Sequence, residues 1–102
     1  MSEIILIGTG GETRAFAAAG LCCFEPGRGR LIERVLAERV RCRVLALTPG
    51  AFSALPAALA VTLRESPRPA LAIVPPLNDP EEAALVVDRL HRHHAGFGDL
   101  AA

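Results

Sequence analysis

The sequence predicts a single α/β domain with a four-stranded parallel sheet, and three observations support this fold class. Four short apolar runs recur along the 102 residues, and turn residues such as glycine and proline end each one. The runs are almost continuous in branched and aliphatic side chains, which is typical of strands buried on both faces of a sheet. A segment of helical composition follows each run. The resulting order, β-α-β-α-β-α-β-α, predicts a Rossmann-like or receiver-like domain of three layers with right-handed crossovers.

The first unit comprises a strand over residues 4–7, a glycine turn over residues 8–11 and a short helix over residues 12–19. Gly20 closes this helix. A glycine turn that leads from a buried strand into a helix is where doubly wound proteins often bind phosphate. The turn is therefore the first candidate for a ligand site.

The second unit begins with a strand over residues 21–24, which the turn residues 25–27 end. A helix is expected over residues 28–39. Its apolar residues recur at three- and four-residue steps and predict one apolar stripe: Leu31, Ile32, Val35, Leu36 and Val40. Arg34 and Glu38 stand four residues apart and predict a modest ion pair on the polar side.

The third strand is predicted over residues 43–48 and the fourth over residues 70–74. Between them, Pro56 would remove a backbone donor from a helix interior, so we expect a short helical turn and then a new helix that begins near Pro56. Leucines at four-residue steps in this segment are expected to face the sheet: Leu55, Leu59 and Leu63.

The last helix is predicted over about residues 79–95. Asn78 or Asp79 can cap it, and Pro80 suits its first position. Its core-facing residues are expected to be Ala83, Val86, Val87, Leu90 and His94. Leu85 falls nearly opposite this face, among charged residues.

Length and composition predict one domain over residues 1–98, with residues 99–102 as a short flexible C-terminal tail. The formal net charge is +0 and the pI is about 6.8. This balance argues against a protein that binds nucleic acid through bulk charge. The chain has no lysine, which removes any mechanism that needs a catalytic or phosphate-binding lysine.

The three cysteines predict a protein of the reducing cytoplasm. An odd number that includes an adjacent pair does not make a secreted disulfide framework, and no signal peptide is expected. Cys22 and Cys23 would lie on opposite sides of the second strand, both beneath helices, while Cys42 precedes the third strand. The longest apolar run, residues 51–63, is interrupted by Pro56 and is shorter than the roughly 20 residues of a membrane span.

No constellation of residues predicts catalysis. The glycine turn lacks the third glycine of a dinucleotide fingerprint, and it lacks the lysine and the serine or threonine of a P-loop. A receiver-type phosphorylation site needs carboxylates and a lysine after its strands. Those places hold no charged group: Thr9-Gly10, Thr48-Pro49 and Val74-Pro75. We therefore expect a non-enzymatic protein with no cofactor.

Two charged clusters have plain explanations. His91 and His94 could share a metal ion on the last helix, but no third ligand is evident, and histidines there complement the helix dipole. Arginines are frequent between residues 28 and 43. Glutamates are interleaved with them and no exposed aromatic residues are expected, so a solvated polar face is favoured over an RNA surface. We expect no metal site and no nucleic-acid partner.

Three stretches, taken together, carry a resemblance to a known family. The strand at residues 4–8 leads into ETRAFAAAGL at residues 12–21, and PRPALAIVPP follows at residues 67–76. VDRL at residues 87–90 leads towards a glycine-apolar pair at residues 96–97. In these stretches the chain resembles the F subunit of the V/A-type (vacuolar/archaeal-type) rotary ATPases, which are also called V-type ATP synthases. Residues 12–21 are similar to the family's segment "E-T-x-x-G-F-x-L-A-G", and residues 67–76 are similar to its segment "P-x-(apolar run)-I-P".

The resemblance implies a non-catalytic protein of the rotor's central stalk. Such a protein binds the coiled coil of the D subunit, couples ATP turnover to ion transport, and is peripheral to the membrane through the complex. The resemblance places the partner contact on the C-terminal helix. From the helix geometry, we expect the outward-facing contacts at Leu85, Arg89, Arg92 and His93. The alternative is a stand-alone regulatory domain that binds a small anionic ligand at residues 8–12.

Overall fold

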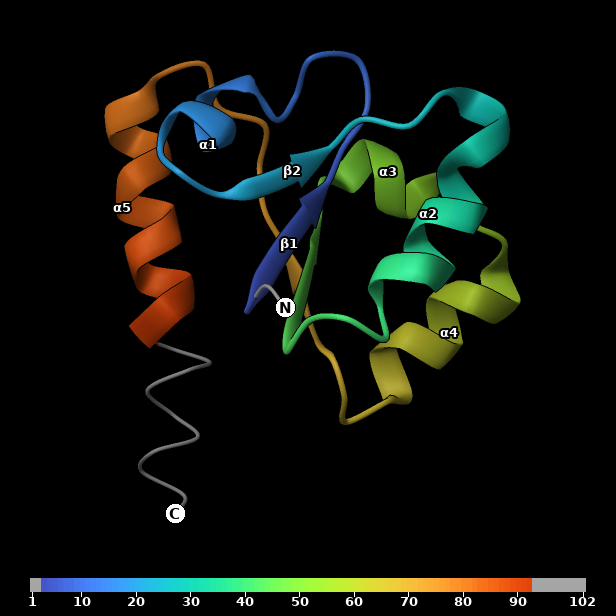
Figure 1. The fold of residues 1–102 in the computed structure, drawn as a ribbon. Helices are drawn as coiled ribbons and strands as arrows, with labels where there is room; N and C mark the ends of the chain where they lie inside the picture. Colours follow the sequence, from blue (N-terminus) through green and yellow to red (C-terminus); the bar gives the residue numbers. More distant parts are fainter. Residues whose placement is uncertain (1–2, 93–102) are drawn as a thin grey trace.

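The computed structural model of the protein describes residues 3–92, and it confirms the predicted fold class. A four-stranded parallel sheet has helices on both faces (Figure 1). The strands are β1 (Ile4–Ile7), β2 (Cys22–Phe24), β3 (Val44–Leu47) and β4 (Ala70–Ile73). The helices are α1 (Arg14–Ala18), the 3-10 helix η1 (Arg28–Arg30), α2 (Leu31–Glu38), α3 (Pro49–Ser53), α4 (Ala57–Glu65) and α5 (Pro80–Leu90).

The strand order in the sheet is β2-β1-β3-β4. Ile5 of β1 aligns with Cys22 on one side and with Leu45 on the other, and Leu45 aligns with Leu71 of β4. The chain thus runs from β1 to β2 on one side, and then crosses back over β1 to β3 on the other side. In open α/β sheets, ligands bind at the carboxyl ends of the strands where the order reverses in this way. The turn after β1 and the turn after β3 meet at that place.

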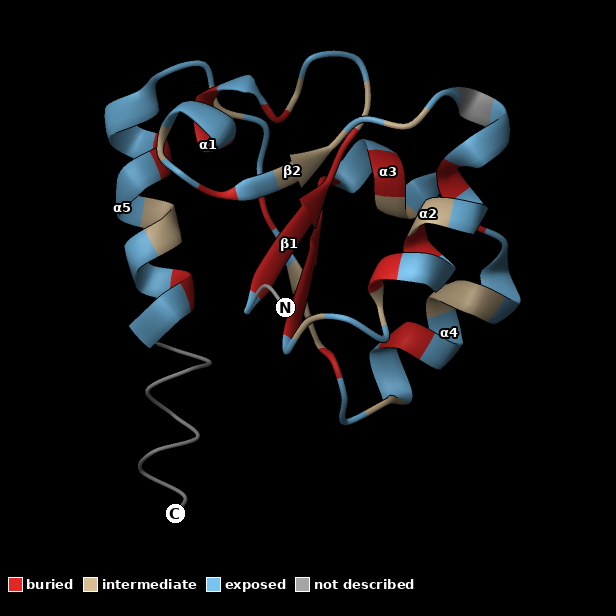
Figure 2. Cartoon of the chain, in the orientation of Figure 1, coloured by how far each residue is buried: buried red, intermediate tan, exposed pale blue. Residues whose placement is uncertain are grey.

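The two faces of the sheet bury two separate apolar clusters. Helices α1 and α5 cover one face, and α2, α3 and α4 cover the other (Figure 1). Because side chains alternate along a strand, Leu6 of β1 points to the first face and Ile7 to the second. Burial is continuous along β1 and β3, as Figure 2 shows, which confirms the prediction of strands covered on both faces for these two. For β2 and β4 the prediction is wrong, because these strands lie at the edges of the sheet and are only partly buried.

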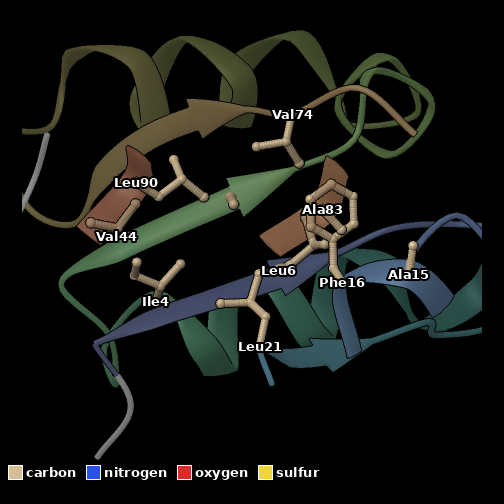
Figure 3. Close-up of a cluster of buried hydrophobic side chains, with 10 residues drawn as sticks. Ile4, Leu6, Ala15, Phe16, Leu21, Val44, Val74, Ala83 and Leu90 are labelled. Carbon is tan, nitrogen blue, oxygen red and sulfur yellow. The ribbon is translucent and has the colours of Figure 1, made fainter. Parts of the chain in front are cut away.

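Phe16 anchors the first unit in the cluster beneath α1 and α5. Its side chain is fully buried, and Figure 3 shows it beside Leu6 and Ala83. Helix α1 is shorter than predicted and begins at Arg14, because the residues before it form turns. This short helix is therefore held by tertiary packing, since an isolated helix of this length is unstable in water.

The break at Pro56 is confirmed, with α3 before it and α4 after it. Leu55 and Leu63 are buried and Leu59 is half-buried, so the predicted leucine face meets the sheet. At the start of α5, Asp79 is the cap, since its carboxylate accepts a hydrogen bond of 3.0 Å from the Glu81 N–H. The core-facing side of α5 is as predicted within the described residues: Ala83 and Leu90 are buried, and Val86 and Val87 are half-buried.

The prediction of one apolar stripe on α2 is wrong. Leu31 and Val35 are buried against the sheet, but Ile32, Leu36 and Val40 are 43%, 46% and 76% exposed. A helix turns by about 100° per residue, so residues 32, 36 and 40 point away from the direction set by residues 31 and 35. Both sets, residues 31 and 35 and residues 32, 36 and 40, recur with the helical period, but the helix buries only the first set.

The prediction for Glu38 is also wrong, because its side chain is buried rather than on the surface. It is only 2% exposed and lies on the sheet-facing side with Leu31 and Val35. The predicted pair with Arg34 forms at 2.8 Å, and the Arg34 guanidinium also covers the Phe24 ring at 4.5 Å from its centroid. A buried carboxylate needs such a partner, because an unpaired charge there would be costly.

Several predictions fall outside the described residues 3–92. These concern His93, His94, the glycine-apolar pair at residues 96–97, the domain end at residue 98 and the tail at residues 99–102. Within the described part of the chain, no helix is long and apolar enough to cross a membrane.

Candidate functional site

The turn after β1 is built on tight packing and two left-handed residues. A Cβ atom on Gly8 would lie 2.7 Å from Thr13 Cγ2 and 3.0 Å from Thr48 Cγ2, so only glycine fits there without movement. Gly10 and Gly11 have φ angles of +55° and +83°, which glycine adopts without the steric cost of a Cβ. These three glycines are therefore needed for the conformation of the turn and for its close packing.

The Glu12 carboxylate joins this turn to the end of β3. Its Oε1 atom accepts hydrogen bonds from the Thr9 N–H at 2.9 Å, the Thr9 hydroxyl at 2.9 Å and the Thr48 hydroxyl at 2.6 Å. The bond from Thr48, helped by those from Thr9, holds the pKa of Glu12 below its usual value of 4.5 against the opposing effect of burial. Glu12 thus acts as a charged brace across the point where the strand order reverses.

The Glu25 carboxylate braces the same turn from the end of β2. It accepts from the Gly11 N–H at 3.1 Å, the Thr13 N–H at 3.0 Å and the Thr13 hydroxyl at 2.5 Å. The hydrogen bonds from Thr13 hold the pKa of Glu25 below its usual value, and the Gly11 N–H and the Arg14 charge add to this effect. The backbone donors of residues 11 and 13 are therefore engaged within the chain.

These contacts decide what the predicted anion site at residues 8–12 can do. An anion at this turn would use backbone N–H donors, and the Glu25 carboxylate already accepts from two of them. A hollow of about 610 Å³ opens beside the turn, with Gly10, Arg14, Glu25 and Asn78 among its lining residues. Glu25 and Arg14 bring charges of opposite sign to this hollow, so charge alone does not select for or against an anion there.

Sequence reasoning misses both braces. The pattern places Glu12 in the first helix. It gives Glu25 as a turn residue after the second strand, close to the place of a ribose-binding acid but on a strand that comes too early in the chain. The signal that was missed is the position of Glu25 directly after β2. The carboxyl ends of parallel strands lie at one edge of the sheet, so a residue at this position lies at the same edge as the turn after β1. Because β2 also lies directly beside β1, Glu25 is next to the glycine turn.

The outer face of α5 is the second candidate site. Leu85 is 66% exposed, and Arg89 and Arg92 follow it at the four- and seven-residue steps that keep side chains on one helix face. The structure thus brings three of the four predicted contacts onto one exposed strip. The fourth, His93, lies outside the described residues.

The charges of this strip are partly compensated. The Arg92 guanidinium pairs with the Asp88 carboxylate at 2.6 Å, with both side chains exposed. Among residues 3–92, Arg89 makes no ion pair. Nδ1 of His91 lies 3.1 Å from the Val87 carbonyl oxygen, so one of its ring nitrogens is engaged by the helix itself. As far as residue 92, the strip therefore presents one apolar side chain and one guanidinium that has no carboxylate partner.

The three cysteines differ in their exposure to solvent. The prediction that both members of the adjacent pair lie beneath helices is wrong, because Cys22 is exposed at the beginning of β2, an edge strand of three residues. Cys23 and Cys42 are half-buried, and burial raises the pKa of each thiol to about 11. Within the described residues, no three His, Cys, Asp or Glu side chains gather to hold a metal ion.

Comparison with known proteins found no matching family model, no matching curated protein and no matching solved structure.

Proposed function

We propose that this chain is a non-catalytic central-stalk protein of a V/A-type rotary ATPase or ATP synthase, similar to the F subunit of that family. In this role it binds the coiled coil of a D-like subunit and couples ATP turnover to ion transport. It would be cytoplasmic and peripheral to the membrane through the complex. The sequence resemblance at residues 12–21 and 67–76 motivates the family.

One structural observation carries the proposal of a partner contact. Helix α5 buries Ala83 and Leu90 in the core and presents Leu85, at 66% exposure, on its outer face. A helix held firmly by one face and carrying an apolar residue on the other can pack against a second helix, with its side-chain ridges in the neighbour's grooves. A coiled coil supplies such grooves along its outer surface.

The proposed role is mechanical and needs no catalytic group. Torque passes through a rotor protein only if the partner helix and the rest of the domain move together. The packing of α5 against α1 and the sheet, through Phe16 and Ala83, gives this rigidity. The ionisable groups at the carboxyl edge, Glu12 and Glu25, are engaged in bracing the first turn.

The alternative function, a regulatory domain that binds a small anion at residues 8–12, is favoured by the glycine turn and the adjoining hollow. It is opposed by Glu25, whose carboxylate accepts the hydrogen bonds of the Gly11 and Thr13 N–H groups. An anion that used these two N–H groups would have to displace this side chain before it could bind. This cost makes the partner-binding function the better supported of the two.

Co-purification with a D-like subunit tests the proposal. The wild-type chain should retain the D-like subunit on a column, and the double variant Leu85→Glu/Arg89→Glu should lose it. The first substitution replaces an apolar contact by a charge, and the second reverses the sign of a charge. Val61→Glu is the matched control, since Val61 is an exposed apolar residue (49%) on α4, across the sheet from α5. Equal retention by the double variant and the control would reject this surface.

Thermal unfolding with nucleotides and acyl phosphates tests the alternative. Ligand that binds only the folded state raises the melting temperature in a concentration-dependent way. The proposed function predicts no saturable shift. A reproducible, saturable rise that disappears on changing the glycine turn would favour the regulatory domain.

A further inference from the structure

The exposed apolar residues of α2 form a ridge on the surface. Ile32 and Leu36 lie on the helix and Val40 lies on the turn that continues it, and they are 43%, 46% and 76% exposed. Ile32 and Leu36 stand four residues apart and lie along one row of the helix surface, and Val40 follows on the turn. Rows of this kind are the ridges that fit the grooves of a second helix.

The ridge cannot turn inward, because the inner side of α2 is already occupied. Leu31 and Val35 fill the sheet-facing side and pack in the cluster with β1 and β3. Arg34 fixes the rotation of the helix further, since it binds the buried Glu38 at 2.8 Å and covers the Phe24 ring. Exposure of the ridge is therefore a property of the packed helix.

The ridge lies in the basic part of an electrically balanced chain. Residues 28–43 contain six arginines and two glutamates, a net formal charge of +4, whereas the whole chain has a net charge of +0. Glu38 is paired with Arg34, and Arg43 lies 3.5 Å from Glu3. Arg39 and Arg41, which flank Val40 in the chain, have no carboxylate partner among residues 3–92.

We propose that α2 is a docking surface for an amphipathic helix of a partner protein, with carboxylates beside its apolar stripe. The apolar stripe would pack on the ridge of residues 32, 36 and 40, and the carboxylates would pair with Arg39 and Arg41. Such charges set the partner and the orientation more than the affinity. A second copy of this chain is disfavoured because two basic surfaces would face each other, and a nucleic acid is disfavoured because the centre of the surface is apolar.

This surface goes beyond the proposed function and does not rest on it. α2 and α5 cover opposite faces of the sheet (Figure 1). A partner on α2 would therefore leave the outer face of α5 free. The two surfaces can be tested independently, with Leu85→Glu as the variant of the other face.

The test uses the isotopically labelled full chain and two synthetic helical peptides, followed by amide chemical shifts. Both peptides carry the same leucine stripe, and their polar faces are glutamate-rich in one and lysine-rich in the other. The glutamate peptide should cause saturable shifts centred on residues 30–43. The lysine peptide should cause none. Leu36→Glu should weaken binding by about tenfold, because it removes an apolar contact and places a carboxylate beside those of the peptide.

Two further variants keep the test independent of folding. Val40→Glu changes the most exposed residue of the ridge and should also weaken binding, while Arg39→Glu/Arg41→Glu should abolish the preference for the glutamate peptide. Unchanged amide shifts elsewhere verify that each variant is folded. Leu85→Glu should bind the peptide as the wild type does.

Four results would overturn the proposal. One is the absence of saturable shifts with the glutamate peptide, and another is equal binding of the lysine peptide. A third is the loss of binding in Leu85→Glu with binding retained in Val40→Glu. The fourth is a shift of residues 30–43 that does not need the peptide. A shift caused by protein concentration alone would assign the surface to a second copy of the chain, and a shift caused by a single-stranded RNA oligomer would assign it to nucleic acid.

Discussion

The turn after β1 and the outer face of α5 differ in how their polar and apolar groups are used. At the turn, Glu12 and Glu25 accept six hydrogen bonds from neighbouring backbone and hydroxyl donors. On α5, Leu85 stays exposed and Arg89 has no ion-pair partner within the described part of the chain. The polar groups of the turn are thus largely used within the chain, whereas α5 keeps a large apolar side chain exposed to solvent.

The largest expected effect concerns the core beneath the turn. Phe16→Ala should lower the free energy of unfolding by about 3–5 kcal/mol, because it leaves a cavity where a fully buried ring now packs. Urea denaturation followed by far-UV circular dichroism measures this change. A loss below about 1 kcal/mol would mean that the first unit is not an integral part of the core.

A smaller loss is expected from Gly8→Ala. The added methyl group would meet Thr13 Cγ2 at 2.7 Å and Thr48 Cγ2 at 3.0 Å. Overpacking of this kind typically costs about 1–3 kcal/mol of stability. Gly27→Ala is the matched control, since a Cβ there meets nothing within 4 Å. If both variants unfold at the same urea concentration, the close packing of the turn is not a constraint.

The braces themselves should make stability depend on pH. The pKa values of Glu12 and Glu25 are lower in the folded protein than their usual 4.5, so the unfolded chain binds protons more readily. Their contribution is present above about pH 4.5 and is lost as the pH falls through the folded-state pKa values. Melting temperatures measured from pH 7 to pH 3 should fall more steeply for the wild type than for Glu12→Gln/Glu25→Gln. Parallel curves would contradict the account of the braces.

The smallest expected effect is on the stability of α5 variants. Leu85 is 66% exposed and belongs to neither buried apolar cluster, so the free energy of unfolding of Leu85→Glu should stay within about 0.5 kcal/mol of the wild type. Chemical denaturation tests this directly. A loss comparable with that of Gly8→Ala would show that Leu85 serves the fold and would remove it from the candidate surface.

Local patterns were enough to predict the strands and the fold class. Continuous apolar runs identified β1 and β3, since strands covered on both faces need no polar side chain. Pro56 and Asp79 marked helix boundaries through backbone chemistry that depends only on neighbouring residues. The outward position of Leu85 followed from the helix period, because the opposite face of α5 has one clear apolar set.

Features that depend on strand order could not be predicted in this way. The exposure of Cys22 follows from the edge position of β2, and the contact of Glu25 with the glycine turn follows from β2 lying beside β1. On α2, residues 31 and 35 and the residues one step later have the same period and similar hydrophobicity. Only the position of the helix on the sheet decides which set is buried.

The most direct test of the central claim is site-specific photocrosslinking within an assembled rotary complex. A photoreactive amino acid replaces Leu85 in one sample and Val61 in another, and the crosslinked partner is identified by mass spectrometry. The account predicts that position 85 crosslinks to the coiled coil of the D-like subunit and that position 61 does not. Crosslinking to that coiled coil at position 61 alone, or at neither position in a complex that contains this chain, would contradict it.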